Sequence, residues 1–310
     1  FGSGLAAIDC VMNFLSPGAE VVSTINLYGG SYRIFTKIFE NYGIKFHFIG
    51  MENADNIEHY ISEKTKLIWV ETPTNPMNII DIAAVSAVAK KHQILLAVDN
   101  TFATPYLQNP LDLGADIVMH SATKYLGGHS DVVMGALVVN DKALADKLYF
   151  IQNSCGAVCG PMDSFLVLRG IKTLHVRMQR HCENGKAVAE YLANHPKIEK
   201  VYWPGFTNHP NHEIAKKQMK DFGGMVSFVT KGNNIKDAFK ILENLKIFTL
   251  AESLGGVQSL SGHPACMSHA SIPQAERVKI VGVASLIRLS IRIEDIVALF
   301  AGGSLAFGDI

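Results

Sequence analysis

Lys124 lies in a segment whose residue types could do covalent chemistry. It follows an apolar run, stands among hydroxyl residues and precedes the pair Gly127-Gly128. If such a lysine is partly buried, its pKa falls and it becomes a nucleophilic amine that can form a Schiff base. Ser121 and Thr123, two residues apart in the same segment, could both donate hydrogen bonds to an anion. An exposed loop lysine beside flexible glycines explains this segment equally well.

A carboxylate stands at the end of a predicted buried strand. Asp99 follows the run 94–98, which contains no polar residue and therefore predicts a central strand of a parallel sheet. Ligands of open parallel sheets bind beyond the carboxyl ends of the strands. A carboxylate buried there costs free energy unless a cation or hydrogen-bond donors face it. A simple turn residue, with Asn100-Thr101 following, has about the same weight.

The segment Ser3-Gly4-Leu5 opens an apolar helical pattern near the start of the chain. Free backbone N–H groups and the positive end of a helix dipole form a ready site for a phosphate. The motifs GxGxxG and GxxxxGK[ST] are absent, so neither a dinucleotide fingerprint nor a P-loop is supported. Taken alone, the segment is slightly more typical of an ordinary serine cap.

Three further residues could contact a ligand. Tyr28 precedes Gly29-Gly30, which would let its ring lie close to a ligand, although most such segments are simply turns. The pair Thr74-Asn75 has prolines on both sides, which would hold the Asn75 amide rigidly in a ligand site or in a plain rigid loop. Arg288 lies within an apolar run and needs an anionic partner such as a carboxylate, unless it faces water from an edge strand.

Composition excludes several classes of protein. The 310 residues carry 28 basic and 28 acidic side chains, and this zero net charge argues against a nucleic-acid partner. No apolar run approaches the ~18–20 residues of a membrane span. Five cysteines, an odd number, predict free thiols in a reducing compartment and hence a cytoplasmic protein. Cys155 and Cys159 are separated by three residues without a second pair, so no metal site is expected.

The elements that must position these residues alternate along the first half of the chain. Short β-branched runs alternate with segments of helical period, which predicts an α/β fold with a mostly parallel sheet and helices on both faces. The predicted strands are residues 20–25, 44–49, 66–70, 94–98, 116–119 and 133–139, and the predicted helices are residues 5–15, 31–42, 54–62, 82–92 and 143–152.

The rhythm changes after about residue 160. A long helical pattern from 162 to 193 is interrupted near 169–170, and residues 204–212 are typical of a surface loop. We therefore expect two domains, an α/β ligand-binding domain at 1–175 and a smaller C-terminal α+β domain at 176–310. In the second domain the predicted strands are 224–229, 247–250 and 286–291, and the predicted helix is 235–245.

Taken together, these pieces resemble the Cys/Met-metabolism family of enzymes that depend on pyridoxal 5'-phosphate (PLP). The resemblance covers nearly all of the chain, and its stretches are long and specific. They are SGLAAI at 3–8, LYGGSYR at 27–33, ETPTNP at 71–76, VDNTFATPYLQNPLDLGAD at 98–116, HSATKYLGGHSD at 120–131, RGIKTL at 169–174, FTLAESLGGVQSL at 248–260, HPACMSHASIP at 263–273 and SLIRLS at 285–290.

The resemblance implies the PLP-dependent transferase fold, fold type I, and a role for each matching residue. It implies that Lys124 holds PLP through a Schiff base and then moves protons, while Asp99 keeps the pyridine nitrogen protonated. It also implies that Tyr28 stacks on the ring and that the enzyme is a homotetramer, a dimer of dimers with shared active sites. The residues implied to hold the phosphate are Gly4, Leu5, Ser121 and Thr123, and those implied to bind the substrate carboxylate are Asn75, Ser253 and Arg288.

The branch of the family is indicated by two local features. Gly30 does not match the methionine γ-lyases, which carry Cys there, whereas the run 250–256 resembles the cystathionine γ-lyases and γ-synthases. In these, Glu252 would contact the distal amino group of the substrate. The stretches 68–77, 152–165 and 177–185 look slightly more like the γ-lyase branch, so the implied reaction is α,γ-elimination of cystathionine to cysteine, 2-oxobutanoate and ammonia.

Four alternatives stay open. The nearest is γ-replacement, in which an acylated homoserine reacts with cysteine as in cystathionine γ-synthase, and β-elimination is a weaker third reading. A non-catalytic PLP-binding fragment is the alternative from another class. A nicotinamide-binding Rossmann protein is disfavoured by the absent glycine fingerprint.

Both ends of the chain depart from the family pattern. The chain begins Phe1-Gly2-Ser3 without a Tyr-x-Arg pair that would reach the phosphate of a neighbouring subunit, so we expect that an N-terminal segment is missing. Arg292 stands where the family usually carries Gly. The tail FAGGSLAFGDI at 300–310 is expected to replace an amphipathic helix.

Overall fold

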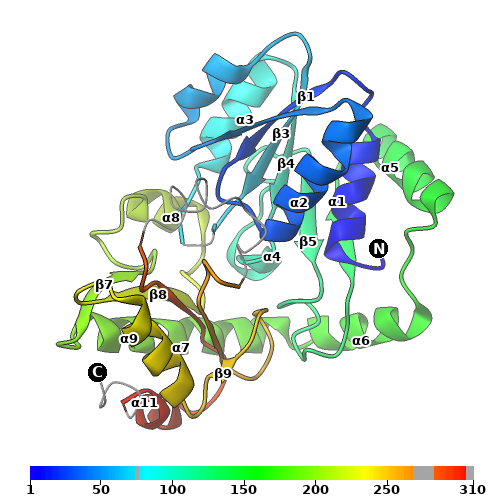
Figure 1. Ribbon diagram of the computed structural model, residues 1–310. Coiled ribbons are helices and arrows are strands. Elements are labelled where there is room, and N and C mark those ends of the chain that lie inside the picture. Colours follow the sequence, from blue (N-terminus) through cyan, green and yellow to red (C-terminus); the bar gives the residue numbers. More distant parts are fainter. Residues whose placement is uncertain (75–76, 268–282, 305–310) are drawn as a thin grey trace.

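Two β-sheets organise the part of the chain that the computed structural model describes, residues 1–74, 77–267 and 283–304 (Figure 1). The first sheet has the order β2-β1-β3-β4-β5-β6, and its neighbours are parallel except for the antiparallel pair β5 and β6. The predicted, mostly parallel sheet is confirmed. Its strands are β1 Glu20–Thr24, β2 Lys45–Ile49, β3 Thr65–Glu71, β4 Leu95–Asp99, β5 Ile117–Ser121 and β6 Gly135–Val138.

Helices cover both faces of this sheet because successive strand residues point to opposite sides. Leu67 and Trp69 of β3 pack in the cluster that α1, α2 and α5 complete, whereas Ile68 and Val70 pack in the cluster of η2 and α3. The strand is therefore apolar on both faces, as a buried parallel strand must be. The helical elements are α1 Gly4–Asn13, α2 Gly29–Lys37, η1 Phe39–Tyr42, η2 Ala54–Tyr60, α3 Ile82–Lys91, α4 Thr104–Leu107 and α5 Lys142–Cys155.

The second sheet lies in the C-terminal part of the chain and has the order β7-β8-β11-β10-β9. Two helices, α6 and α7, replace the interrupted helical pattern, and α7 runs along this lower part of the molecule (Figure 1). Its elements are α6 Pro161–Ile171, α7 Leu174–Ala193, β7 Ile198–Tyr202, α8 His212–Gln218, β8 Met225–Thr230, α9 Ile235–Asn244, β9 Thr249–Leu250, β10 Leu260–Gly262, β11 Ile287–Ser290 and α11 Ile296–Ser304.

The chain forms a helix where its tail was expected to replace one. Helix α11 extends to Ser304, so the expectation is wrong for the first residues of the tail. Ile296, Leu299 and Phe300 recur at helical spacing and pack on the core of the second sheet, and the Phe300 ring lies 5.2 Å from that of Tyr191. This apolar contact stabilises the helix despite its glycines.

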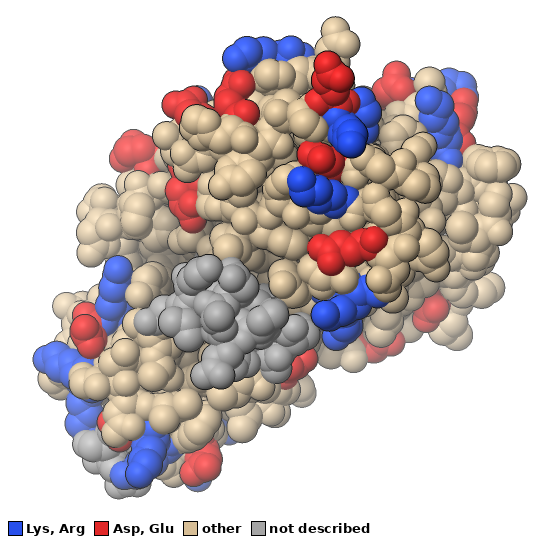
Figure 2. Space-filling view, turned by 45° about the horizontal axis from the view of Figure 1, so that its top comes forward, with Lys and Arg blue, Asp and Glu red and all other residues tan. Residues whose placement is uncertain are grey.

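The distribution of surface charge and the character of the helices bear on whether the protein binds nucleic acid or crosses a membrane. On the face shown in Figure 2, acidic and basic side chains are interspersed, and neither sign gathers over a large area. Within the described residues, no helix combines the length and the apolar character needed to cross a membrane.

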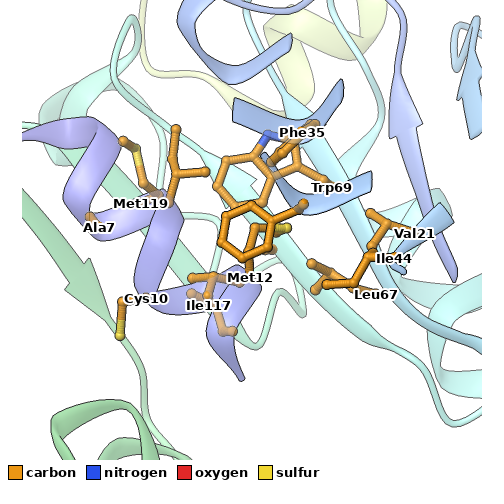
Figure 3. Packing of buried hydrophobic residues seen from close by; sticks show 14 of the residues in the cluster. Ala7, Cys10, Met12, Val21, Phe35, Ile44, Leu67, Trp69, Ile117 and Met119 are labelled. Carbon is orange, nitrogen blue, oxygen red and sulfur yellow. The ribbon is translucent and has the colours of Figure 1, made fainter. Parts of the chain in front are cut away.

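The sheet core depends on close aromatic packing, which predicts a large stability effect at Phe35. This fully buried ring stacks on Phe46 at 4.7 Å. It also meets Trp69 edge-on at 5.7 Å (Figure 3). We expect Phe35→Ala to lower the free energy of unfolding by about 3–5 kcal/mol, as large-to-small changes in cores do. Urea denaturation followed by circular dichroism measures this.

The matched control is Tyr42→Ala, because the Tyr42 side chain is 65% exposed. We expect this variant to lose less than about 1 kcal/mol. Equal losses for the two variants would contradict the packing described for Phe35.

Candidate active site

A cavity of about 370 Å³ lies where the carboxyl ends of β3, β4 and β5 face the start of α1 and the segment before β10. Its walls come from both sheets. Asn75 falls outside the described residues, so its predicted position is left open. Ten of the residues predicted for the site line the cavity: Gly4, Leu5, Tyr28, Asp99, Ser121, Thr123, Lys124, Glu252, Ser253 and Arg288.

The start of α1 forms one wall of the cavity. Ser3 caps the helix, since its Oγ accepts a hydrogen bond from the N–H of Ala6 at 3.0 Å, so the cap interpretation of Ser3 is correct. Gly4 lies so close to β5 that an added Cβ would stand 3.1 Å from the Oγ of Ser121. A Cβ on Gly135 would overlap the Ser3 carbonyl. The backbone amides of the helix start and the Ser121 hydroxyl therefore face the same space, which suits an anion.

Asp99 is buried at the end of β4, as predicted. Its Oδ1 accepts a hydrogen bond from the N–H of Thr101 at 3.0 Å, and the Thr101 hydroxyl accepts one from the N–H of Ser121 at 2.8 Å. Burial raises the pKa of the Asp99 carboxyl to about 6, and the bonds from Thr101 oppose this shift. Sequence reasoning missed Thr101, although its position two residues after an aspartate is typical of a turn that holds the carboxylate.

Lys124 has the environment of an activated amine. Its Nζ donates a hydrogen bond to the Oγ of Ser253 at 2.7 Å. Burial lowers its pKa to about 8, with further contributions from the charges of Arg288 and Arg292. Gly255, at φ +76°, lies against the backbone here, and a Cβ on it would stand 2.6 Å from the Tyr125 nitrogen. The exposed-lysine interpretation of this segment is therefore wrong.

Arg288 enters the cavity from the centre of the second sheet. Its strand, β11, lies between β8 and β10, so the edge-strand alternative is wrong. The side chain is buried, and its Nη2 donates to the carbonyl oxygen of Ser253 at 3.2 Å. Burial lowers the pKa of the guanidinium to about 10, which leaves it charged at neutral pH. Glu252 lines the same cavity but is exposed.

A hydrogen bond from its backbone fixes Tyr28, and its ring is half exposed. Its N–H donates to Oε2 of Glu71 at 2.7 Å, and Glu71 also lines the cavity. A Cβ on Gly30 would overlap the Tyr28 ring, so this glycine is needed for the ring position. Glu71 directly follows the predicted strand 66–70, but sequence reasoning gave it no role.

Arg292, which stands where the family usually carries Gly, fits against the segment around Gly256. It is 1% exposed, and its Nε and Nη2 have no hydrogen-bond partner among the described residues. A Cβ on Gly256 would overlap its guanidinium. The Arg292 side chain therefore fits here because residue 256 is a glycine and has no Cβ.

Lysine, strand-end aspartate and arginine meeting at the edge of an α/β sheet define an enzyme of the PLP-dependent, fold type I class. Comparison with known proteins agrees: residues 1–306 match the Cys/Met metabolism PLP-dependent enzyme family, and the chain belongs to it. It is 52% identical to a cystathionine γ-lyase of Dictyostelium discoideum, over 99% of this chain and 79% of the relative.

Two further relatives bear on the branch of the family. A cystathionine β-lyase of Coxiella burnetii is 50% identical, over 96% of this chain and 78% of the relative. The crystal structure of a cystathionine γ-lyase from Lactobacillus plantarum complexed with L-serine superposes with a TM-score of 0.97 at 42% identity, covering 100% of this chain and 81% of that one.

The described residues fit the chemical groups of PLP. The helix start at Gly4 and the hydroxyl of Ser121 suit a phosphate, and the buried carboxyl of Asp99 suits a protonated pyridine nitrogen. The amine of Lys124, with its lowered pKa, suits an aldehyde.

The lowered pKa of Lys124 predicts an unusual pH profile for the protein freed of PLP. Below its pKa the amine is protonated and unreactive, so labelling of Lys124 by a small aldehyde and borohydride should rise with a midpoint near pH 8. A lysine in a model peptide, which titrates near about 10.4, is the reference. Peptide mass spectrometry quantifies the labelled residue.

The same measurement on Arg292→Leu tests the electrostatic part of the shift. Removing a nearby positive charge stabilises the protonated amine, so the midpoint should move to higher pH. A midpoint at the model-peptide value in the unsubstituted protein would contradict the burial of Lys124.

Proposed function

We propose that this chain is a carbon–sulfur lyase that cleaves cystathionine by α,γ-elimination to cysteine, 2-oxobutanoate and ammonia. The observation that carries this proposal is that the Lys124 amine, the Asp99 carboxyl and the Arg288 guanidinium line one and the same cavity. Membership of the family and the similarity to two cystathionine γ-lyases support it.

The cofactor residues follow from the chemistry of the cavity walls. Lys124 would hold PLP covalently, the helix start at Gly4 and Leu5 with the hydroxyls of Ser121 and Thr123 would bind its phosphate, and Tyr28 would cover its ring. Asp99, buried and hydrogen-bonded, would remain ionised opposite a cationic nitrogen. When bound, PLP supplies a conjugated cationic ring that delocalises the electron pair left when a proton departs from the substrate carbon.

The remaining residues would bind the substrate and move its protons. Arg288 presents a buried, charged guanidinium that suits the α-carboxylate bidentately, and Asn75 and Ser253 would complete this contact. Glu252, at the exposed part of the cavity, would attract the distal ammonium group. Lys124 Nζ, with a pKa of about 8, can both accept and return a proton near neutral pH.

A second candidate is β-elimination, which gives homocysteine, pyruvate and ammonia from the same substrate. The 50% identity to a protein named cystathionine β-lyase favours it. The γ-replacement reaction, in which cysteine displaces the acyloxy group of an acylated homoserine, is also a candidate, since it would use the same residues. A non-catalytic PLP-binding protein is opposed by the complete set of Tyr28, Asp99, Lys124 and Arg288 around one cavity.

The keto acid released from cystathionine distinguishes α,γ-elimination from β-elimination. We expect the PLP-loaded protein to release 2-oxobutanoate rather than pyruvate, because elimination at the γ-carbon leaves a four-carbon keto acid. Chromatography of the keto acids after derivatisation measures this ratio. Lys124→Ala is the matched control and should lose at least about 10³-fold in rate, as removal of a catalytic nucleophile and base does.

Pyruvate as the main keto acid would establish β-elimination instead. Faster turnover of an acylated homoserine with cysteine would favour γ-replacement. Full activity in Lys124→Ala would overturn every one of these assignments.

We also propose a homotetramer in a reducing, cytoplasmic setting. Three apolar side chains at helical spacing on α6, Met162, Phe165 and Leu168, are 60–66% exposed, and such a patch is typical of an interface. All five cysteines are free thiols, which supports a reducing compartment.

The interface assignment predicts that Phe165→Glu lowers the assembly state. A buried charge without a partner destabilises an interface, so light scattering should show a mass below that of the tetramer. Val297→Glu, at a 70% exposed position on α11, is the control and should leave the mass unchanged. A tetramer of unchanged stability in Phe165→Glu would contradict this surface.

A further inference from the structure

Two carboxyl groups end neighbouring strands at the cavity. Glu71 is the last residue of β3 and Asp99 the last residue of β4, and the two stand opposite each other in the parallel register. Opposed residues on adjacent strands project to the same face about 4.8 Å apart at the backbone. Both side chains are buried, at 4% and 6% exposure, and both line the cavity.

Each of the two carboxyls accepts a backbone N–H group. Oε2 of Glu71 accepts the backbone N–H of Tyr28 at 2.7 Å, and Oδ1 of Asp99 accepts the backbone N–H of Thr101 at 3.0 Å. Neither carboxyl forms an ion pair with a lysine, arginine or histidine in the described part of the chain. Two buried carboxylates side by side without such a cation cannot both remain ionised at low free-energy cost.

The surroundings indicate which of the two keeps a proton. The titratable or charged groups lining the cavity with Glu71 are Tyr28, Asp99, Lys124, Glu252 and Arg288. Burial, followed by the charge of Asp99, raises the pKa of Glu71 well above its ordinary range. Burial raises the pKa of Asp99 to about 6, and the hydrogen bonds from Thr101, which stabilise its charged form, oppose this rise.

We propose that Glu71 is a positioning residue that stays protonated, so that its neutral carboxyl anchors the backbone of Tyr28 while Asp99 alone carries the negative charge at this edge of the sheet. The carbonyl oxygen of a protonated carboxyl still accepts the Tyr28 N–H, so the anchor does not need a charge. A single negative charge also matches a single cationic ring nitrogen, whereas a second would be left unpaired on cofactor binding.

This inference rests on the proposed function for its effect on PLP binding, but not for the protonation of Glu71. The decisive variants are therefore Glu71→Gln, which keeps an uncharged acceptor, and Glu71→Ala, which removes the anchor. Glu213→Gln makes the same chemical change at an 83% exposed side chain and is the control.

The first experiment is infrared spectroscopy of the PLP-free protein at neutral pH. The difference between the unsubstituted protein and Glu71→Gln should contain the carbonyl band of a protonated carboxylic acid, and the difference with Glu213→Gln should lack it. Absence of this band from the Glu71→Gln difference overturns the proposal, whether or not the protein is an enzyme.

The second experiment titrates each PLP-free variant with PLP and follows the absorbance of the bound cofactor. We expect Glu71→Gln to keep the dissociation constant within about two-fold, and Glu71→Ala to weaken it about ten-fold, the equivalent of one lost hydrogen bond. Equal weakening by the two variants would show that the charge of Glu71 is required and would overturn the proposal.

The infrared spectra and the PLP titrations distinguish a failure of this inference from a failure of the proposed function. If Glu71→Ala does not fold, the infrared band and the affinity of Glu71→Gln still decide. If no variant and no unsubstituted protein binds PLP, the proposed function fails, while the infrared result continues to test the protonation of Glu71.

Discussion

A negative charge held inside the protein at the end of β4 is the constraint on which the site depends. Burial alone would favour the neutral form of Asp99, and its pKa of about 6 reflects that pressure. The N–H of Thr101 opposes it, and Thr101 in turn receives the N–H of Ser121 from β5. The N–H of Thr101 thus holds the carboxylate, and the bond from Ser121 fixes Thr101 against the end of β5.

Close backbone approach is the second requirement of the site. Gly4, Gly30 and Gly255 each stand where a Cβ would press on a cavity residue or its backbone. They allow the helix start, the Tyr28 ring and the 253–256 segment to lie against elements that the sheet has already positioned. Charge and shape therefore come from different residue types, with polar groups at the strand ends and glycines at the contacts between segments.

The sequence predicted the first sheet well because its central strands β3 and β4 are buried on both faces and carry apolar runs. It missed β7, in which only Ile198 is buried, and β10, which has only three residues and is a strand because β9 and β11 flank it. Long-range pairing of this kind leaves little local signal.

The same distinction holds for the site. Lys124, Asp99 and Arg288 were found because a charged residue beside or within an apolar run is conspicuous. Glu71 and Thr101 were not, since their roles depend on the register between strands and on contacts across the fold. The helix α11 was missed because its glycines obscure an apolar pattern that only the second core explains.

The position of β11 in the middle of its sheet has a consequence for synthesis on the ribosome. The strand separates β8 from β10, so the sheet has no centre until residues 287–290 have left the exit tunnel. The cavity likewise joins Ser3 to Arg288, which are far apart in the sequence. A nascent chain can fold its first sheet early, yet it cannot present a finished pocket to a vitamin-derived ligand until Arg288 has been synthesised.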